Sequence, residues 1–163
     1  MRRPLAALAA LAASIAVAAA VPAHAAPLPP PSGWTVTTAL GGGAEVGSHS
    51  STGIGELELG IGYELGIARP ELGLVLGLSP GNYAGVRPGL HFALPGLPLY
   101  GRGALDVSHA GGDWRARWLL AGAGAELGFT SVLGAFAEVD LGVPLTQGDG
   151  VGLLGRAGFA VRF

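Results

Sequence analysis

Residues 54–66, IGELELGIGYELG, alternate between two kinds of side chain. From Leu57 onward, leucine, isoleucine and tyrosine occupy the odd positions, while glutamate and glycine occupy the even positions. Successive side chains of a β-strand point to opposite faces of the sheet, so a strand repeats every second residue. The segment is therefore predicted to be a strand with one apolar face and one face of glycine and carboxylate.

Seven further stretches of the chain show the same alternation. The eight segments are 34–46, 54–66, 71–79, 83–94, 99–109, 114–128, 132–143 and 151–163. They are separated by breaks at 47–53, 67–70, 80–82, 95–98, 110–113, 128–131 and 144–150, most of which contain glycine, proline or serine. Alternating segments punctuated in this way predict eight short strands joined by turns.

Two architectures can hold such strands: a soluble sandwich and a membrane barrel. The polar face of a sandwich meets bulk water and is expected to carry much lysine, threonine and glutamine. Here lysine is absent and charged residues make up 12% of the chain, while glycine numbers 30 and dominates the polar parity. Glycine with a few charged residues suits the narrow interior of a small closed barrel. A closed barrel also leaves no backbone N–H or C=O group unpaired in lipid. The sequence therefore predicts an all-β fold, an eight-stranded antiparallel up-and-down transmembrane β-barrel.

The start of the chain is typical of an export signal. Arg2 and Arg3 precede an apolar stretch at 5–21, and Ala23-His24-Ala25 forms a small-residue cleavage motif. A membrane-spanning helix is disfavoured because the stretch is short, alanine-rich and followed by that motif. We expect a signal peptide at 1–25, cleaved near Ala25, then a proline-rich periplasmic tail at 26–33 and the barrel at 34–163.

An even number of strands places both ends of the barrel on one side. With the proline-rich tail in the periplasm, the breaks at 67–70, 95–98 and 128–131 become inner turns and the other four become short outer loops. Arg115 and Arg117 fall on the apolar parity, so we expect them beyond the membrane core. Aromatic side chains expected to face lipid or the membrane interfaces are Trp34, Tyr63, Phe92 and Phe163.

Over residues 34–163 the chain resembles the small eight-stranded outer-membrane β-barrel proteins of OmpA/OmpX-like architecture. Its ending, GRAGFAVRF, places Phe159, Val161 and Phe163 at alternate positions and resembles the signal read by the outer-membrane barrel assembly machinery. The resemblance implies location in the cell outer membrane, contact with outer-membrane lipid and lipopolysaccharide, and handling by periplasmic chaperones. We expect no OmpA-type peptidoglycan-binding domain.

Charged side chains on the polar parity are expected to pair inside the barrel, because an unpaired buried charge is costly. The predicted lumen charge network consists of Glu56, Glu58, Arg87, Arg102, Asp106, Glu138 and Arg156. Counting back from the turn at 95–98 places Arg87 opposite Asp106. Counting back from 144–150 places Glu138 opposite Arg156, with Asp140 nearby.

Several functions are open to such a barrel. The leading hypothesis is a monomeric structural or envelope-interaction protein without catalysis, cofactor or metal. The alternative is a narrow channel, or a binder of small cations or ligands, that uses the acidic outer lumen, although eight strands leave little open space. Nucleic acid is not an expected partner, because removing Arg2 and Arg3 from the nine arginines leaves seven against eleven acidic residues.

A lipid-modifying enzyme is a third hypothesis, and it would need a hydroxyl nucleophile and a histidine base on one surface. Ser108 and His109 are the available pair, but neighbours in a strand point to opposite faces. His91 is expected to face the lumen without a second histidine beside it. A hydrogen-bonded interior histidine is therefore expected there rather than a metal ligand.

Overall fold

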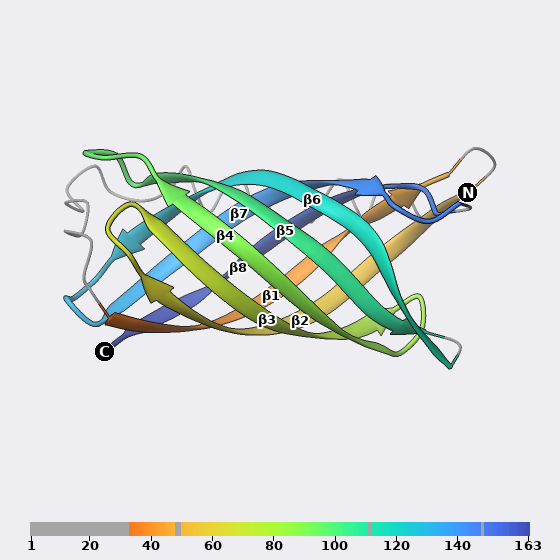
Figure 1. Cartoon of the computed structure of the whole chain (residues 1–163), viewed down its shortest axis with the longest axis horizontal. Helices are drawn as coiled ribbons and strands as arrows, with labels where there is room; N and C mark the ends of the chain where they lie inside the picture. The colour runs from red at the N-terminus through yellow and green to blue at the C-terminus, as the bar shows by residue number, and fades with distance from the viewer. Residues whose placement is uncertain (1–32, 48–49, 111, 148) are drawn as a thin grey trace.

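A computed structural model describes residues 33–47, 50–110, 112–147 and 149–163 of the 163-residue chain. Eight antiparallel strands form one closed barrel in which each strand pairs with its neighbour in sequence and β8 returns to β1 (Figure 1). The strands are β1 (Gly33–Val46), β2 (Ser51–Glu64), β3 (Ala68–Ser79), β4 (Tyr83–Ala93), β5 (Leu99–Ala110), β6 (Asp113–Gly128), β7 (Leu133–Pro144) and β8 (Val151–Arg162). The eight-stranded barrel fold predicted from the alternation is thus confirmed, whereas the predicted signal peptide and residues 26–32 of the predicted tail lie outside the described residues.

The two ends of the barrel are distinct (Figure 1). We call the end where β1 begins and β8 finishes the terminal end; it also carries the turns at 65–67, 94–98 and 129–132. The opposite end carries the connections at 47–50, 80–82, 111–112 and 145–150. The first strand therefore begins, and the last strand ends, at the same end of the barrel, as an even number of strands requires.

The turn between β2 and β3 lies earlier than the sequence predicts. Leu65 and Ala68 exchange backbone hydrogen bonds, and Gly66 adopts a φ of 68° that a glycine accommodates without strain. This glycine closes the turn at 65–67, so Arg69 and Pro70 belong to β3 and not to the break predicted at 67–70. The shift places the Arg69 side chain in the lumen, where it is 6% exposed.

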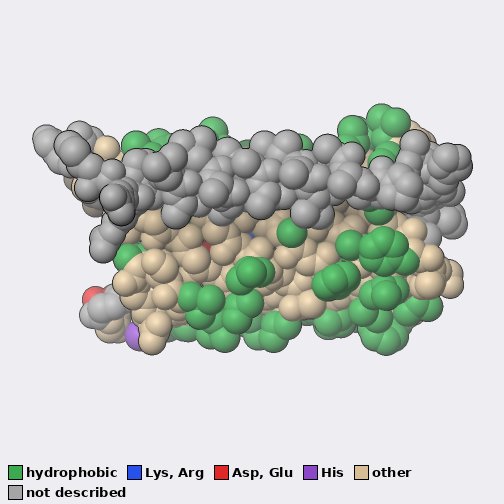
Figure 2. Space-filling model, turned by 180° about the vertical axis from the view of Figure 1, so that it is seen from behind, with side chains coloured by type: hydrophobic (Ala, Val, Ile, Leu, Met, Phe, Trp, Pro, Cys, Tyr) green, Lys and Arg blue, Asp and Glu red, His purple; other side chains and the backbone are tan. Residues whose placement is uncertain are grey.

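Large apolar side chains are exposed on the outside of every strand, and Figure 2 shows patches of them on one face of the barrel. Leu59 and Leu74, which face each other across β2 and β3, are 57% and 55% exposed. The aromatic residues predicted for this surface, Trp34, Tyr63, Phe92 and Phe163, are all exposed. No helix among the described residues is long and apolar enough to cross a membrane.

Two register shifts interrupt the ladders, one beside Glu56 in β2 and one beside Asp106 in β5. Opposite the second shift, Asp106 pairs with Trp118 and Val107 pairs with Ala116, which leaves Arg117 as the extra residue of a β-bulge. The bulge re-aims the Arg117 side chain, which pairs with Glu45 on the lumen side. The prediction that Arg117 lies on the apolar face is therefore wrong, and the bulge is the physical reason.

Candidate functional site

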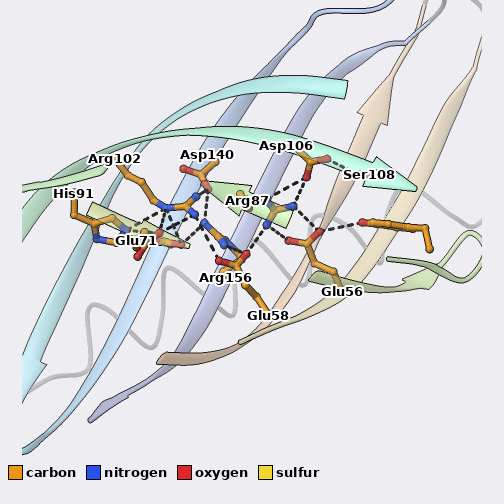
Figure 3. A network of polar contacts seen from close by, with 12 residues as sticks. Glu56, Glu58, Glu71, Arg87, His91, Arg102, Asp106, Ser108, Asp140 and Arg156 are labelled. Carbon is orange, nitrogen blue, oxygen red and sulfur yellow. Dashed lines mark hydrogen bonds and ion pairs between the residues drawn. The ribbon is translucent and has the colours of Figure 1, made fainter. Parts of the chain in front are cut away.

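A network of ion pairs fills the middle of the lumen, and Arg87 of β4 holds one half of it (Figure 3). Its Nη1 donates to Glu56 Oε1 at 2.7 Å and to Glu58 Oε2 at 2.6 Å. Its Nη2 donates to Asp106 Oδ2 at 2.5 Å and to Glu56 Oε2 at 3.1 Å. One guanidinium thus binds three carboxylates from β2 and β5, and no part of it is exposed.

Arg156 of β8 holds the other half of the network. It contacts Glu58 and Glu138, and its Nη2 donates to Asp140 Oδ2 at 2.8 Å. Because Glu58 contacts both Arg87 and Arg156, it joins the two halves into one network. The network therefore ties β2 to β4 and β8, neither of which pairs with it in the sheet.

Arg102 of β5 connects this network to His91 of β4. Arg102 lies 2.7 Å from Asp140 and 3.0 Å from Glu71. His91 Nδ1 is 2.8 Å from Arg69 Nη2 and its Nε2 is 2.9 Å from Glu71 Oε1. Arg102 Nε also lies 3.1 Å from His91 Nε2, so two guanidiniums and one carboxylate surround the imidazole. The ring thus links Arg69 and Arg102 to Glu71.

The middle of the lumen holds more acids than bases. Its carboxylates are Glu56, Glu58, Glu71, Asp106, Glu138 and Asp140, and its guanidiniums are Arg87, Arg102 and Arg156. Asp140 is 1% exposed, and its Oδ1 has no hydrogen-bond partner within the described residues. This excess of carboxylates over guanidiniums gives the region its negative character.

A second, smaller set of ion pairs lies at the terminal end. Arg69 Nη1 is 3.1 Å from both Glu64 Oε1 and Glu126 Oε2, and Arg162 also contacts Glu126. Thr35 donates its hydroxyl to Glu64 at 3.1 Å. These residues come from β1, β2, β3, β6 and β8, so they meet only when the barrel closes.

An apolar cluster lies in the lumen toward the opposite end. It consists of Ile54, Ala104, Trp118, Leu120 and Leu154. Trp118 is fully buried, donates its Nε1 hydrogen to the carbonyl of Gly150 at 2.9 Å, and is covered by the Arg117 guanidinium 3.9 Å from its ring centre. Glu45 contacts Arg117 and accepts from the Gly150 amide at 2.7 Å. The middle network reaches the same end beside this cluster, because Tyr83, the first residue of β4, donates its hydroxyl to Glu56 Oε2 at 3.0 Å.

Glycine makes room for the large lumen side chains. A Cβ on Gly142 or Gly152 would lie 3.0 Å and 3.2 Å from Trp118 atoms, so both glycines form the floor under the indole. Tyr100 lies against Gly124 in the same way and donates its hydroxyl to Glu138 at 2.8 Å. The glycines at lumen-facing positions thus leave space for large side chains from other strands.

All seven residues of the predicted lumen charge network lie in the lumen, and each is buried. The predicted register between β7 and β8 is confirmed, since Glu138 faces Arg156 directly. The predicted neighbours Arg87 and Asp106 are also in contact. Counting from turns succeeded here because both hairpins have regular pairing next to the turn.

Charged lumen residues missing from the predicted network include Glu64, Arg69, Glu71, Glu126, Asp140 and Arg162. Glu71, Glu126 and Arg162 share the polar parity of their strands, so the alternation itself could have identified them. Arg69 could not be identified in this way because its segment reads as a turn.

Ser108 and His109 do not form a catalytic pair. The Ser108 hydroxyl is buried and donates to Asp106, whereas His109 lies on the other face, its ring centre 5.4 Å from that of Trp114. Among the residues that the structure describes, no three or more His, Asp or Glu side chains are grouped so that they could hold a metal ion.

The chain was compared with known proteins and structures. No protein-family model matches it, and no curated protein sequence matches it. The crystal structure of Neisserial surface protein A (NspA) superposes with a TM-score of 0.56 at 16% identity, over 81% of this chain and 98% of that one. The N-terminal β-barrel domain of Pseudomonas aeruginosa OprF superposes with a TM-score of 0.51 at 17% identity, over 79% of this chain and 97% of that domain. The chain thus has the fold of small eight-stranded outer-membrane barrels.

Proposed function

We propose that this chain is an integral outer-membrane β-barrel with a structural or envelope-interaction role and without catalysis. The observation that carries the proposal is the combination of an apolar outer surface with a lumen occupied by ion pairs and by the buried Trp118 cluster. An exposed apolar surface of this extent needs lipid around it. Because the lumen is filled, partners would contact the outer surface and the loops of the barrel.

The proposed partners follow from that location. Outer-membrane lipid and lipopolysaccharide surround the barrel, which is a monomer, and periplasmic chaperones and the barrel assembly machinery deliver it after signal-peptide removal near Ala25. Phe159, Val161 and Phe163 are the residues that the assembly machinery would read. Phe159 and Phe163 are 54% and 76% exposed, as contact with a partner requires.

Fractionation combined with electrophoresis tests the proposal. We expect the protein in the outer-membrane fraction, and we expect the unheated sample to migrate differently from the boiled sample in SDS, since a closed barrel with every strand paired resists the detergent. Recovery from the soluble periplasm with identical mobility of the two samples would refute the proposal.

A narrow channel or small-cation binder is the second candidate function. The acid excess of the middle lumen and the unpartnered Asp140 Oδ1 favour it, whereas the Trp118 cluster opposes it. Planar-bilayer recordings separate the two functions. A steady conductance that shifts when Glu56 and Glu58 are both changed to Gln would support the channel, and absence of conductance in native protein would support the structural role.

A further inference from the structure

A cavity of about 220 Å³ lies at the terminal end of the barrel, beside the turn between β4 and β5. Its walls are largely apolar and come from Ile67 and from residues 93–99. Leu94 and Leu97 are exposed, so the walls reach the molecular surface and a small molecule can enter from that end. The charged residues of its floor are Glu64, Arg69, Glu126 and Arg162.

The guanidinium groups of the floor offer no hydrogen-bond donor to a ligand. Arg69 Nη1 contacts Glu64 and Glu126. Its Nη2 lies 2.8 Å from His91 Nδ1, and Arg162 Nη2 contacts Glu126. The remaining nitrogens, Arg69 Nε, Arg162 Nε and Arg162 Nη1, are buried. A ligand that needs to accept a hydrogen bond therefore finds no accessible guanidinium donor.

The two rings that border the cavity, His91 and Tyr100, add no free donor either. They stack on each other with ring centres 4.7 Å apart. Tyr100 donates its hydroxyl to Glu138 at 2.8 Å, and both ring nitrogens of His91 already have partners. The pair thus contributes ring surface to the cavity rather than hydrogen bonds.

The floor does offer an acceptor, which is the Glu64 carboxylate. Glu64 borders the cavity, and its side chain is 12% exposed. Its Oε1 accepts from the Thr35 hydroxyl and from Arg69 Nη1, both at 3.1 Å, whereas its Oε2 has no hydrogen-bond partner within the described residues. Both oxygens of Glu126, in contrast, contact guanidiniums. An occupant of the cavity is therefore expected to donate a hydrogen bond to Glu64 Oε2.

Charge and size restrict the occupant further. Arg69 and Arg162 are matched by Glu64 and Glu126, so a neutral molecule preserves the balance. An anion would meet the open carboxylate oxygen, and a cation would lie beside two guanidiniums without a further acid to offset it. An apolar cavity of roughly 150 Å³ accepts a benzene molecule, so a cavity of this size suits one ring or two fused rings.

We propose that this cavity binds a small, neutral aromatic molecule that carries one hydrogen-bond donor, which it gives to Glu64. An indole ring has this chemistry, because its N–H group only donates and the rest of the ring is apolar. The site is distinct from the acidic middle lumen, where an excess of carboxylates would favour cations.

Indole and indene test the proposal, because they have nearly the same shape and only indole carries an N–H donor. NMR titration of the native chain in lipid nanodiscs follows the backbone amides of the turns at 65–67 and 94–98. We expect saturable shifts with indole and an affinity at least about tenfold above that for indene, given the strength of a hydrogen bond to a charged acceptor. Equal affinities would overturn the proposal, as would shifts that grow without saturation, which indicate partition into lipid.

Three variants locate the site. Ala93→Phe places a ring in the cavity wall and should abolish indole binding, whereas Ala84→Phe, at an exposed position near the other end of β4, should leave it unchanged. Glu64→Leu removes the acceptor and should make the affinities for indole and indene equal. Their ratio within one variant is insensitive to a general loss of stability. Unchanged indole binding in Ala93→Phe, or a preference for indole that survives Glu64→Leu, would overturn the proposal.

Discussion

The lumen residues show how a narrow interior tolerates many charges. Arg87 spreads its guanidinium over three carboxylates, and Glu58 is shared between Arg87 and Arg156. In such a network each ion is stabilised by several partners, so removal of one ion leaves several others unmatched.

We predict that Arg87→Ala strongly destabilises the barrel. The change leaves Glu56, Glu58 and Asp106 facing one another without their shared cation, and breaking a buried pair in this way costs about 3–5 kcal/mol. Urea unfolding from lipid vesicles measures the loss. Asp113→Ala is the control, since its side chain is exposed at a strand end, and a similar loss in both variants would contradict the role assigned to Arg87.

A double-mutant cycle on Glu138 and Arg156 is expected to show coupling. The two residues face each other across β7 and β8 and are in contact. The losses in free energy of unfolding caused by Glu138→Ala and by Arg156→Ala should therefore not add in the double variant. Contacting residues in one network typically couple by about 0.5–3 kcal/mol. Strictly additive losses in free energy of unfolding would show that the contact contributes nothing to stability.

Each strand of this barrel has one face on the outside of the barrel and one face in the lumen. The outer face carries leucine, isoleucine and aromatic side chains, and the inner face alternates glycine with long polar or aromatic side chains. Glycines on one strand lie beneath side chains from the next, so the space inside is filled across strands.

We predict that Gly142→Val in β7 destabilises the barrel by about 1–3 kcal/mol through overpacking against Trp118. A Cβ at this position would already lie 3.0 Å from the indole, and the branched side chain needs more room. Tryptophan fluorescence and urea unfolding report the change. Gly101→Val is the matched control, because a Cβ there has no atom within 4 Å, and equal losses would argue against the packing of Trp118 described above.

A charged side chain introduced on the outer face should lower the stability of the barrel in lipid. Leu59→Arg or Leu74→Arg should each reduce stability in vesicles by about 2–4 kcal/mol if the residue lies near the bilayer midplane. Leu97→Arg, in the turn at 94–98 and equally exposed, should have little effect because it lies beyond the strands. Tolerance of arginine at both Leu59 and Leu74 would mean that this face does not meet lipid.

On the scale of the whole molecule, the lumen exists because the sheet closes on itself. β8 pairs with β1 along its length, and the backbone of Phe163 donates to the carbonyl of Trp34 at 2.9 Å. The end of the chain therefore completes the barrel physically, in addition to the recognition role proposed for its side chain.

Deleting Phe163 is predicted to lower outer-membrane insertion more than Leu153→Ala, because the deletion removes a recognition element while Leu153→Ala removes only some exposed apolar area. Quantification of the folded, unheated form in membranes measures insertion. Phe163→Ala keeps the backbone, so it separates recognition of the ring from the bond to Trp34. Equal insertion of the deletion and Leu153→Ala would contradict a terminal signal.

The sequence by itself determined the number of strands, the face of most of their side chains and two of their registers. These properties are local: a period of two assigns each side chain to a face, and a short turn fixes which residues of a hairpin meet. For this reason the neighbours Arg87 and Asp106, and Glu138 and Arg156, could be predicted by counting.

Only the tertiary structure decided which charges meet across the lumen. Arg102 of β5 binds Asp140 of β7, and Arg69 of β3 binds Glu126 of β6, although neither pair belongs to adjacent strands. Such contacts depend on the closure of the sheet and on the stagger of its strands, which no local pattern encodes. The bulge that turns Arg117 inward is of the same kind, because it is a mismatch between two strands and is visible only when both are in place.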